Sequence, residues 1–225
     1  MKSKNIAVIP ARKNSQGFKF KNRILFDETL NFLKDINWFD QKILTTDDEV
    51  LINRGKKNDL KVLKRSKKNS KNNVSIKKVM EEVVDQIKPE PDDKIWLLYL
   101  TIPYKNKKDF NNVKKISQDK NFKSLLSFRE VITHPFDCWI VKPKLKQLIK
   151  NDAFRRQDKP TVYEHYHYLV CFKVSHLKKL NDELINKDTI PYLITGYSKY
   201  KINEIDTQFD LAYYKLLNKK SFSNY

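Results

Sequence analysis

The chain has 225 residues, an apolar share of 40% and a formal net charge of +19. This length and apolar share predict one sizeable domain that folds without disulfides. No apolar run approaches the roughly 20 residues of a transmembrane helix, and the opening MKSKN lacks the apolar core of a signal peptide, so we expect a cytoplasmic protein without a membrane partner.

The positive charge raises the question of nucleic acid binding. The lysines are spread along the whole chain, and neither a helix-turn-helix nor a zinc-finger pattern is visible. The densest stretch, residues 61–78, is interpreted first as a solvated loop, with a nucleic-acid arm or a wall of an anion site as alternatives. Nucleic acid is therefore a disfavoured partner.

The opening stretch from Ile6 to Asn22 combines a short apolar run with a cation-rich loop. Ile6 to Pro10 is typical of a buried strand, and the loop after it contains several cations and hydrogen-bond donors. Such a loop can hold a triphosphate, although an exposed basic loop without a ligand remains the alternative. Neither the Walker pattern nor the Rossmann glycine pattern is present.

Strands and helices alternate along the next hundred residues. Asp47 and Asp48 are suited to cap a helix that Gly55 ends. The predicted strands are 42–46, 60–63, 95–100 and 124–128, and the predicted helices are 49–54, 74–87 and 108–117. This order predicts a mostly parallel sheet with helices on both faces and a ligand at the carboxyl ends of the strands.

From about residue 129 the pattern changes to short aromatic segments at 137–141 and 163–172, with a helix near 176–180. We expect a single domain, 1–225, whose main sheet comes from about 1–130 and 198–225. The insertion at about 130–197 is predicted to form a lid or a dimerisation subdomain. The closing stretch predicts a strand, then a helix capped by Thr207 and Asp210.

Five segments, taken in order, resemble the cytidylyltransferases that activate acidic sugars, the CMP-N-acylneuraminate synthetase family. They are IPARKNSQGFKFKN, FDQKILTTDD, LLYLTIP, RRQDKP and NEIDTQFD. The resemblance implies a Rossmann-like fold of the nucleotide-diphospho-sugar transferase type. It also implies transfer of CMP from CTP to an acidic sugar with release of pyrophosphate, Mg²⁺ as cofactor, and a homodimer.

The resemblance assigns roles to residues on the nucleotide side. Arg12, Lys21 and Asp206 match catalytic positions, where charge neutralisation and positioning dominate the chemistry. The nucleotide-binding positions that match are Arg12, Ser15, Lys21, Asn22, Arg65 and, more weakly, Ser75. Asp206 matches the metal ligand of the family, and Glu204 supplies a second carboxylate. Asp206 could instead cap the last helix, but Thr207 already fills that role, whereas Asp210 is interpreted as a capping acid.

The sugar side matches less well. Tyr99 stands where the family has glutamine, and Arg155, Arg156 and Gln157 match a segment in which an arginine faces the sugar acid; a surface pair is the alternative. Tyr166 and His167 replace an Asn-Gly turn, which would fill space near the sugar. We therefore expect an acceptor other than N-acetylneuraminate. The open alternatives are a nucleotidyltransferase of the same fold with a sugar phosphate or short deoxy sugar acid, and an inactive nucleotide- or nucleic-acid-binding protein.

Overall fold

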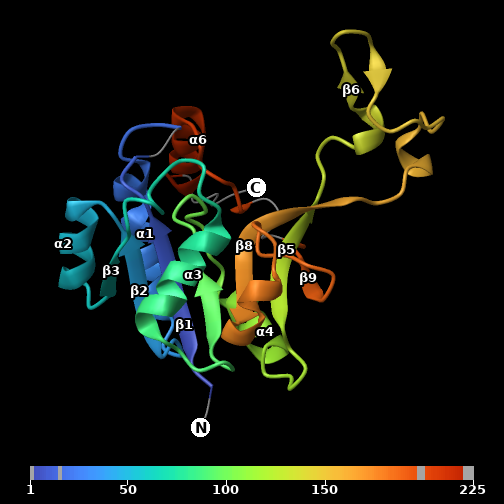
Figure 1. Cartoon of the computed structure of the whole chain (residues 1–225). Helices are drawn as coiled ribbons and strands as arrows, with labels where there is room; N and C mark the ends of the chain where they lie inside the picture. Colours follow the sequence, from blue (N-terminus) through green and yellow to red (C-terminus); the bar gives the residue numbers. More distant parts are fainter. Residues whose placement is uncertain (1–2, 15–16, 197–200, 220–225) are drawn as a thin grey trace.

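A computed structural model describes residues 3–14, 17–196 and 201–219, which form a seven-stranded sheet flanked by helices (Figure 1). The strand order is β3-β2-β1-β4-β8-β5-β9. All neighbouring pairs are parallel except those of β8, which runs antiparallel to β4 and β5. The strands are β1 (Asn5–Ala11), β2 (Gln41–Thr46), β3 (Lys61–Lys64), β4 (Lys94–Leu97), β5 (Ser124–Glu130), β8 (Tyr163–Lys173) and β9 (Thr189–Leu193).

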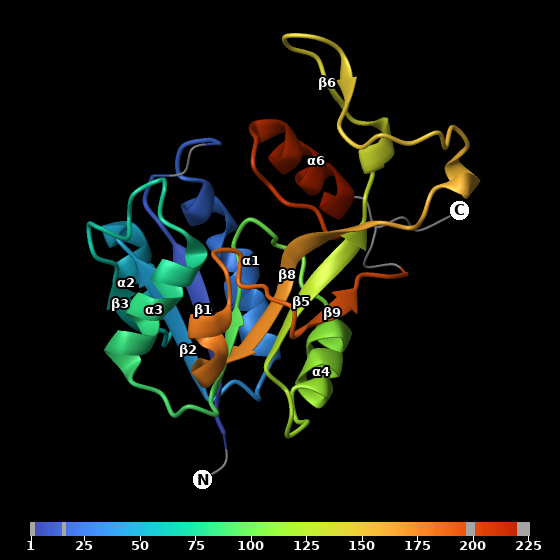
Figure 2. The same cartoon turned by 45° about the vertical axis from the view of Figure 1, so that its right-hand side comes forward.

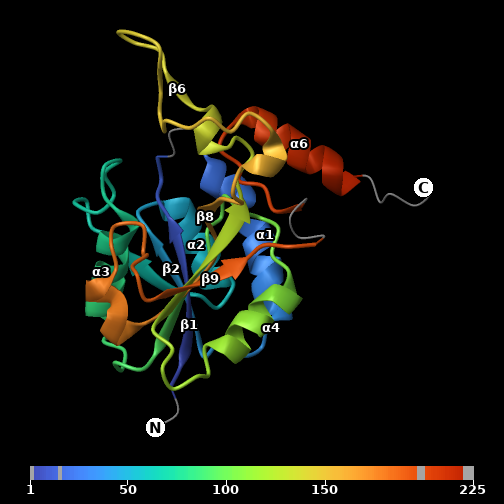
Figure 3. The ribbon, with the colours of Figure 1, turned by 90° about the vertical axis from the view of Figure 1, so that its right-hand side faces the viewer.

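Helices cover both faces of this sheet, as Figure 3 shows with α3 on one side and α1 and α4 on the other. The helices are α1 (Lys21–Asp35), α2 (Glu49–Lys57), α3 (Ile76–Ile87), α4 (Lys107–Ile116) and α6 (Gln208–Lys219), and a 3-10 helix, η3, spans Val174–Lys179. Successive residues of β1 are buried in two different clusters, because neighbouring side chains of a strand point to opposite faces. The predicted α/β fold is confirmed.

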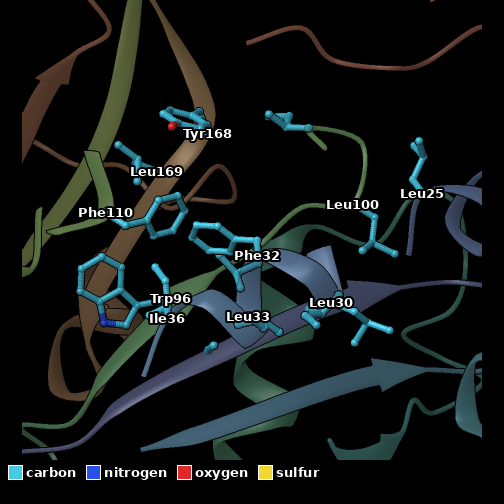
Figure 4. Close-up of a cluster of buried hydrophobic side chains, with 14 of the residues drawn as sticks. Leu25, Leu30, Phe32, Leu33, Ile36, Trp96, Leu100, Phe110, Tyr168 and Leu169 are labelled. Carbon is cyan, nitrogen blue, oxygen red and sulfur yellow. The ribbon is translucent and has the colours of Figure 1, made fainter. Parts of the chain in front are cut away.

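The cluster on the α1 and α4 side is rich in aromatic rings (Figure 4). Phe32 of α1 and Phe110 of α4 lie with ring centroids 4.6 Å apart, and Trp96 of β4 stacks on Phe110 at 6.4 Å. Sequence analysis did not assign α1, although Leu25, Phe26, Leu30, Phe32 and Leu33 are buried along one stripe at helical spacing. This core fixes the amino-terminal end of α1 beside β1.

Two local predictions were wrong. Gly55 does not end α2 but lies inside it, where a Cβ atom would be 2.7 Å from Leu44 Cδ2, so a larger residue would require the Leu44 side chain to shift. The segment 202–206 is not a strand; it is an extended connection held by the Ile205 amide, which donates to the carbonyl of Thr101 at 2.7 Å. The helix predicted near 176–180 is confirmed as the 3-10 helix η3.

The insertion is smaller than predicted, because β8 and β9 belong to the main sheet. What leaves the sheet between β5 and β8 is the segment 131–162, here called the arm, which extends away from the domain in Figures 1 and 2. It contains a short hairpin of β6 (Trp139–Ile140) and β7 (Lys146–Gln147), and 3-10 turns at Pro135–Asp137 and Arg156–Asp158. Within the described ranges, the helices are all too short or too polar to cross a bilayer.

Candidate functional site

A cavity of about 300 Å³ lies at the carboxyl ends of β1, β3 and β4. Strands β1 and β4 are neighbours in the sheet, and the parallel strands that follow them along the chain, β2 and β5, lie on opposite sides of this pair. Open α/β sheets bind ligands at such a position. Six of the predicted site residues line it: Arg12, Lys21, Asn22, Arg65, Tyr99 and Glu204. The structure thus gathers residues from five separate sequence segments around one cavity.

Arg12 follows β1 and is held by polar contacts on both sides. Its Nη1 donates to Oδ1 of Asn72 at 2.7 Å, and the side-chain Nδ2 of Asn22 donates to the Arg12 carbonyl at 2.8 Å. The next residue is fixed as well, because the amide of Lys13 donates to Oδ1 of Asp47 at 2.7 Å. These contacts tie the start of the loop to the ends of β2 and α1.

Lys21 is the first residue of α1, whose amino-terminal amides are favourable for an anion. Its Nζ lies 2.6 Å from Oδ1 of Asp206, and its side chain is only 7% exposed, whereas that of Asp206 is 61% exposed. The two catalytic candidates from opposite ends of the chain therefore form an ion pair, in which the carboxylate keeps a face open to solvent.

Gly17 lets the opening loop touch the backbone of Asp206. A Cβ atom at position 17 would lie 1.8 Å from the Asp206 carbonyl oxygen, so only glycine permits this approach. Sequence analysis placed Gly17 in the loop but gave it no role. The feature that could have indicated a role for Gly17 is the rarity of glycine, since the chain contains only three.

Arg65 extends β3 by one residue, because its amide donates to the Thr46 carbonyl at 3.0 Å. Its side chain is buried, with the whole residue 7% exposed, and Nε has no hydrogen-bond partner among the described residues. Burial lowers the pKa of this guanidinium and Arg12 lowers it further, against the opposing effect of Asp47 and Glu82. A buried cation with unused donor capacity is costly, and a bound anion would compensate it.

Glu204 accepts a hydrogen bond from the Thr101 hydroxyl at 3.2 Å at the edge of the cavity. Partial burial raises its pKa, and the nearby charge of Asp206 raises it further. Two carboxylates two residues apart on an extended segment, both of exposed residues, are a chemically suitable donor set for a hard divalent cation such as Mg²⁺.

The residues predicted for the sugar are divided between two places. Tyr99 lines the cavity, whereas Arg156 and Gln157 line a separate cavity of about 810 Å³ at the base of the arm. Arg155 is bound to Asp158, with Nε to Oδ2 at 2.7 Å, which is the surface pair considered as the alternative. Within one chain the arm thus keeps these three residues out of the cavity at the ends of β1 and β4.

Other predicted positions serve the fold. Ser75 caps α3, accepting a long hydrogen bond from the Lys78 amide, and its neighbours Val74 and Ile76 line the cavity instead. Asp210 is a capping acid as predicted, since it accepts from the Thr207 amide at 2.7 Å. Ser15 lies outside the described residues.

Four polar residues that line the cavity were not predicted from the sequence, namely Asn69, Lys71, Asn72 and Thr101. The first three belong to the lysine-rich stretch that was interpreted first as a solvated loop, although an anion-site wall was considered. Because lysine and asparagine are abundant throughout the chain, composition could not distinguish these three from their neighbours.

No protein-family model and no curated protein sequence matches the chain. Solved structures do match. A CMP:2-keto-3-deoxy-manno-octonic acid synthetase complexed with CTP has a TM-score of 0.69 and 15% identity, covering 96% of this chain and 99% of its own. A 4-diphosphocytidyl-2C-methyl-D-erythritol synthase has a TM-score of 0.64 and 14% identity, covering 97% and 99%.

A cytidylyltransferase from Leptospira borgpetersenii serovar Hardjo-bovis has a TM-score of 0.61 and 14% identity, covering 97% of this chain and 88% of its own. Over nearly its whole length, then, the chain has the fold of these cytidylyltransferases.

Proposed function

We propose that the protein is a cytidylyltransferase that transfers CMP from CTP to an acidic sugar and releases pyrophosphate. The observation that carries the proposal is the cavity at the ends of β1 and β4, where Arg12, Lys21 and Arg65 converge and the Arg65 guanidinium is buried with its Nε unpaired. A triphosphate supplies the negative charge and the acceptor oxygens that this arrangement lacks.

Positioning and charge neutralisation are the main tasks of the protein in this reaction. A hydroxyl of the acceptor attacks the α-phosphorus, and the bond to the bridging oxygen of the β-phosphate breaks, so negative charge accumulates on the departing pyrophosphate. Arg12, Lys21 and the first amides of α1 are suited to stabilise that charge. Arg65 approaches from the β3 side of the cavity.

Asp206 and Glu204 are the residues that would hold Mg²⁺. The bound ion supplies charge neutralisation at the phosphate oxygens. Asp206 has a second task, because its pairing with Lys21 at 2.6 Å orients that ammonium at the start of α1. Loss of Asp206 therefore affects both the metal and the position of Lys21.

The acceptor has two candidate classes. An acidic sugar agrees with the sequence motifs and with the name of the first structural neighbour, a synthetase for an octonic acid. A sugar-alcohol acceptor agrees with the second neighbour, named for a diphosphocytidyl derivative of methylerythritol. It also agrees with Tyr99 and Tyr166, which stand where the resembled family has other residues near the sugar. We place the acidic sugar first, because the five sequence motifs and the name of the first structural neighbour both agree with it.

Pyrophosphate release tests the proposal. The full chain is incubated with Mg²⁺, each of the four ribonucleoside triphosphates, and a panel of 2-keto sugar acids and polyol phosphates. We expect turnover with CTP and a sugar acid, abolished by Asp206→Ala and retained by Asp182→Ala, an exposed acid that does not line the cavity.

The outcomes distinguish the alternatives. Turnover only with a polyol phosphate would mean that the acceptor is a polyol phosphate and not an acidic sugar. Failure of every nucleoside triphosphate to raise the unfolding temperature overturns the site assignment. Salt-sensitive binding of RNA or DNA that is unaffected by Asp206→Ala favours the inactive nucleic-acid-binding alternative.

A further inference from the structure

Two histidines and a glutamate lie together beside the cavity, and the proposed reaction does not use them. His165 and His167 alternate along β8, so both side chains lie on the same side of the strand. Glu183 comes from the loop between η3 and β9. Its Oε2 lies 3.5 Å from Nε2 of His167 and 3.8 Å from Nε2 of His165. One ligand atom from each residue can be chosen so that all three lie within 4.8 Å of one another.

These separations are close to those of a metal site. Bonds of about 2.0–2.2 Å in a tetrahedral arrangement place neighbouring ligand atoms roughly 3.3–3.5 Å apart. The Glu183–His167 distance of 3.5 Å lies at the upper end of this range, and the Glu183–His165 distance of 3.8 Å exceeds it by a few tenths of an ångström, which side-chain rotation can close. His165 and Glu183 are about half exposed, so an ion can enter from solvent.

The protonation chemistry also suits a metal. A metal requires the neutral imidazole, in which one ring nitrogen carries no proton. In the absence of metal, the His167 Nε2–H donates to the Glu183 carbonyl at 3.2 Å. A metal ion at this nitrogen would replace that proton. A divalent ion bound by two neutral imidazoles and one carboxylate would give the site a net charge of +1.

We propose that His165, His167 and Glu183 bind one Zn²⁺ or a similar late first-row divalent ion, with water in the remaining position. Imidazole nitrogen favours such ions over Mg²⁺, whereas Glu204 and Asp206 offer only carboxylates, so the two sites select different metals. The ring of His167 lies 5.3 Å from that of Tyr99, which lines the nucleotide cavity. The ion would therefore lie next to the cavity without being part of it.

The proposal does not depend on the proposed function, and its test uses no turnover. The untagged full chain, stripped of metal, is titrated with Zn²⁺ by calorimetry and with Co²⁺ by visible absorption. We expect one ion per chain and an intense visible band from tetrahedral Co²⁺. His165→Asn and Glu183→Gln should each weaken binding by at least about tenfold, and Asp182→Asn, the same charge change at the adjacent exposed residue, should leave it unchanged.

Unfolding temperatures without metal establish that each variant is folded. Two results would overturn the proposal. Equal Zn²⁺ affinity of Glu183→Gln and Asp182→Asn would mean that Glu183 only anchors its loop through His167. Loss of binding in Glu204→Gln with retention in Glu183→Gln would assign the ion to the carboxylate pair instead.

Discussion

At the scale of single residues, Arg65 and Glu204 line the same cavity and each lies where its charged form is disfavoured. The pKa of Arg65 is lowered and that of Glu204 is raised, in both cases with burial as the largest cause. Such shifts concentrate at functional sites, because a ligand of the opposite charge removes the cost. Removal of either charge should therefore cost function more than it costs stability.

Arg65→Met should weaken CTP binding roughly 10- to 150-fold, because a hydrogen bond to a charged group contributes about 1.5–3 kcal/mol. Without nucleotide, the unfolding temperature should not fall, since methionine replaces a buried and incompletely paired charge. Calorimetric titration with CTP measures the affinity, and Lys67→Met, in the exposed loop that follows, is the control. Wild-type affinity in Arg65→Met would contradict the assignment of Arg65 to the nucleotide.

Glu204→Gln should raise the unfolding temperature at pH 7. The folded-state pKa of Glu204 lies above the unfolded value, so between these two values the folded protein holds more protons, and the free energy of unfolding falls as pH rises through that window. Above the window the full cost of the ionised group remains. The rise in unfolding temperature caused by Glu204→Gln should shrink towards pH 4, where the carboxyl of Glu204 is protonated in both the folded and the unfolded state. Thermal unfolding of both proteins from pH 4 to 8 measures this difference.

Asp206→Asn should have the opposite effect on stability. Asparagine leaves the Lys21 ammonium, whose side chain is 7% exposed, without its carboxylate. The loss should be about 1–3 kcal/mol. Denaturant unfolding of the two variants provides the comparison, and the same sign of change in both would contradict the assigned environments.

At the scale of elements, two of the three glycines fix how a segment packs, and they do so for different purposes. Gly17 brings the opening loop against the backbone of Asp206, at the site, whereas Gly55 brings α2 against Leu44 and Val62, in the core. From the sequence, Gly17 was only part of a loop and Gly55 was predicted to end a helix. Their actual role is close approach, which depends on atoms far away in the sequence.

Gly17→Ala should abolish turnover with little loss of stability, because the backbone at Asp206 cannot move aside and the exposed loop must shift instead. Gly55→Ala should behave in the reverse way, with a loss of about 1–3 kcal/mol from overpacking and nucleotide affinity retained. Denaturant unfolding and CTP titration of both variants measure the two effects. Normal turnover in Gly17→Ala would mean that this contact does not shape the site.

At the scale of the whole molecule, the arm carries apolar side chains that the described part of the chain leaves exposed. Ile132 is 90% exposed and Phe154 is 85% exposed, and Trp139, Val141 and Leu145 are also exposed. Exposed apolar residues gathered on one projection are typical of an interaction surface. We therefore retain the expected homodimer as a proposal, with the arm as its contact.

Val141→Asp with Leu145→Asp should convert a dimer into a folded monomer, because buried charge in an apolar interface is unfavourable. Light scattering during size exclusion gives the mass, and circular dichroism verifies the fold. Lys144→Asp, in the same hairpin, adds a negative charge without loss of apolar surface and should remain dimeric. A wild-type chain that is monomeric at micromolar concentration would overturn the proposal.

The sequence by itself determined the parallel β-α core and most of its elements, because periodic apolar residues reflect burial on one or both faces. The family resemblance also predicted Arg12, Lys21, Arg65 and Asp206 as site residues, of which the first three line one cavity and Asp206 pairs with Lys21. The sequence left α1 unassigned. It also placed β8 and β9 outside the main sheet, because an aromatic-rich segment has the same residue pattern whether it pairs with a central strand or forms a separate subdomain.

Only the tertiary structure decided which of these residues meet. Asp206 pairs with Lys21 across 185 positions, and Arg155, Arg156 and Gln157 lie on the arm rather than at the cavity. Side-chain types and local spacing report the chemistry that each segment can supply. Contacts between distant segments depend on strand order and on the course of the arm, which are fixed only when the whole core packs.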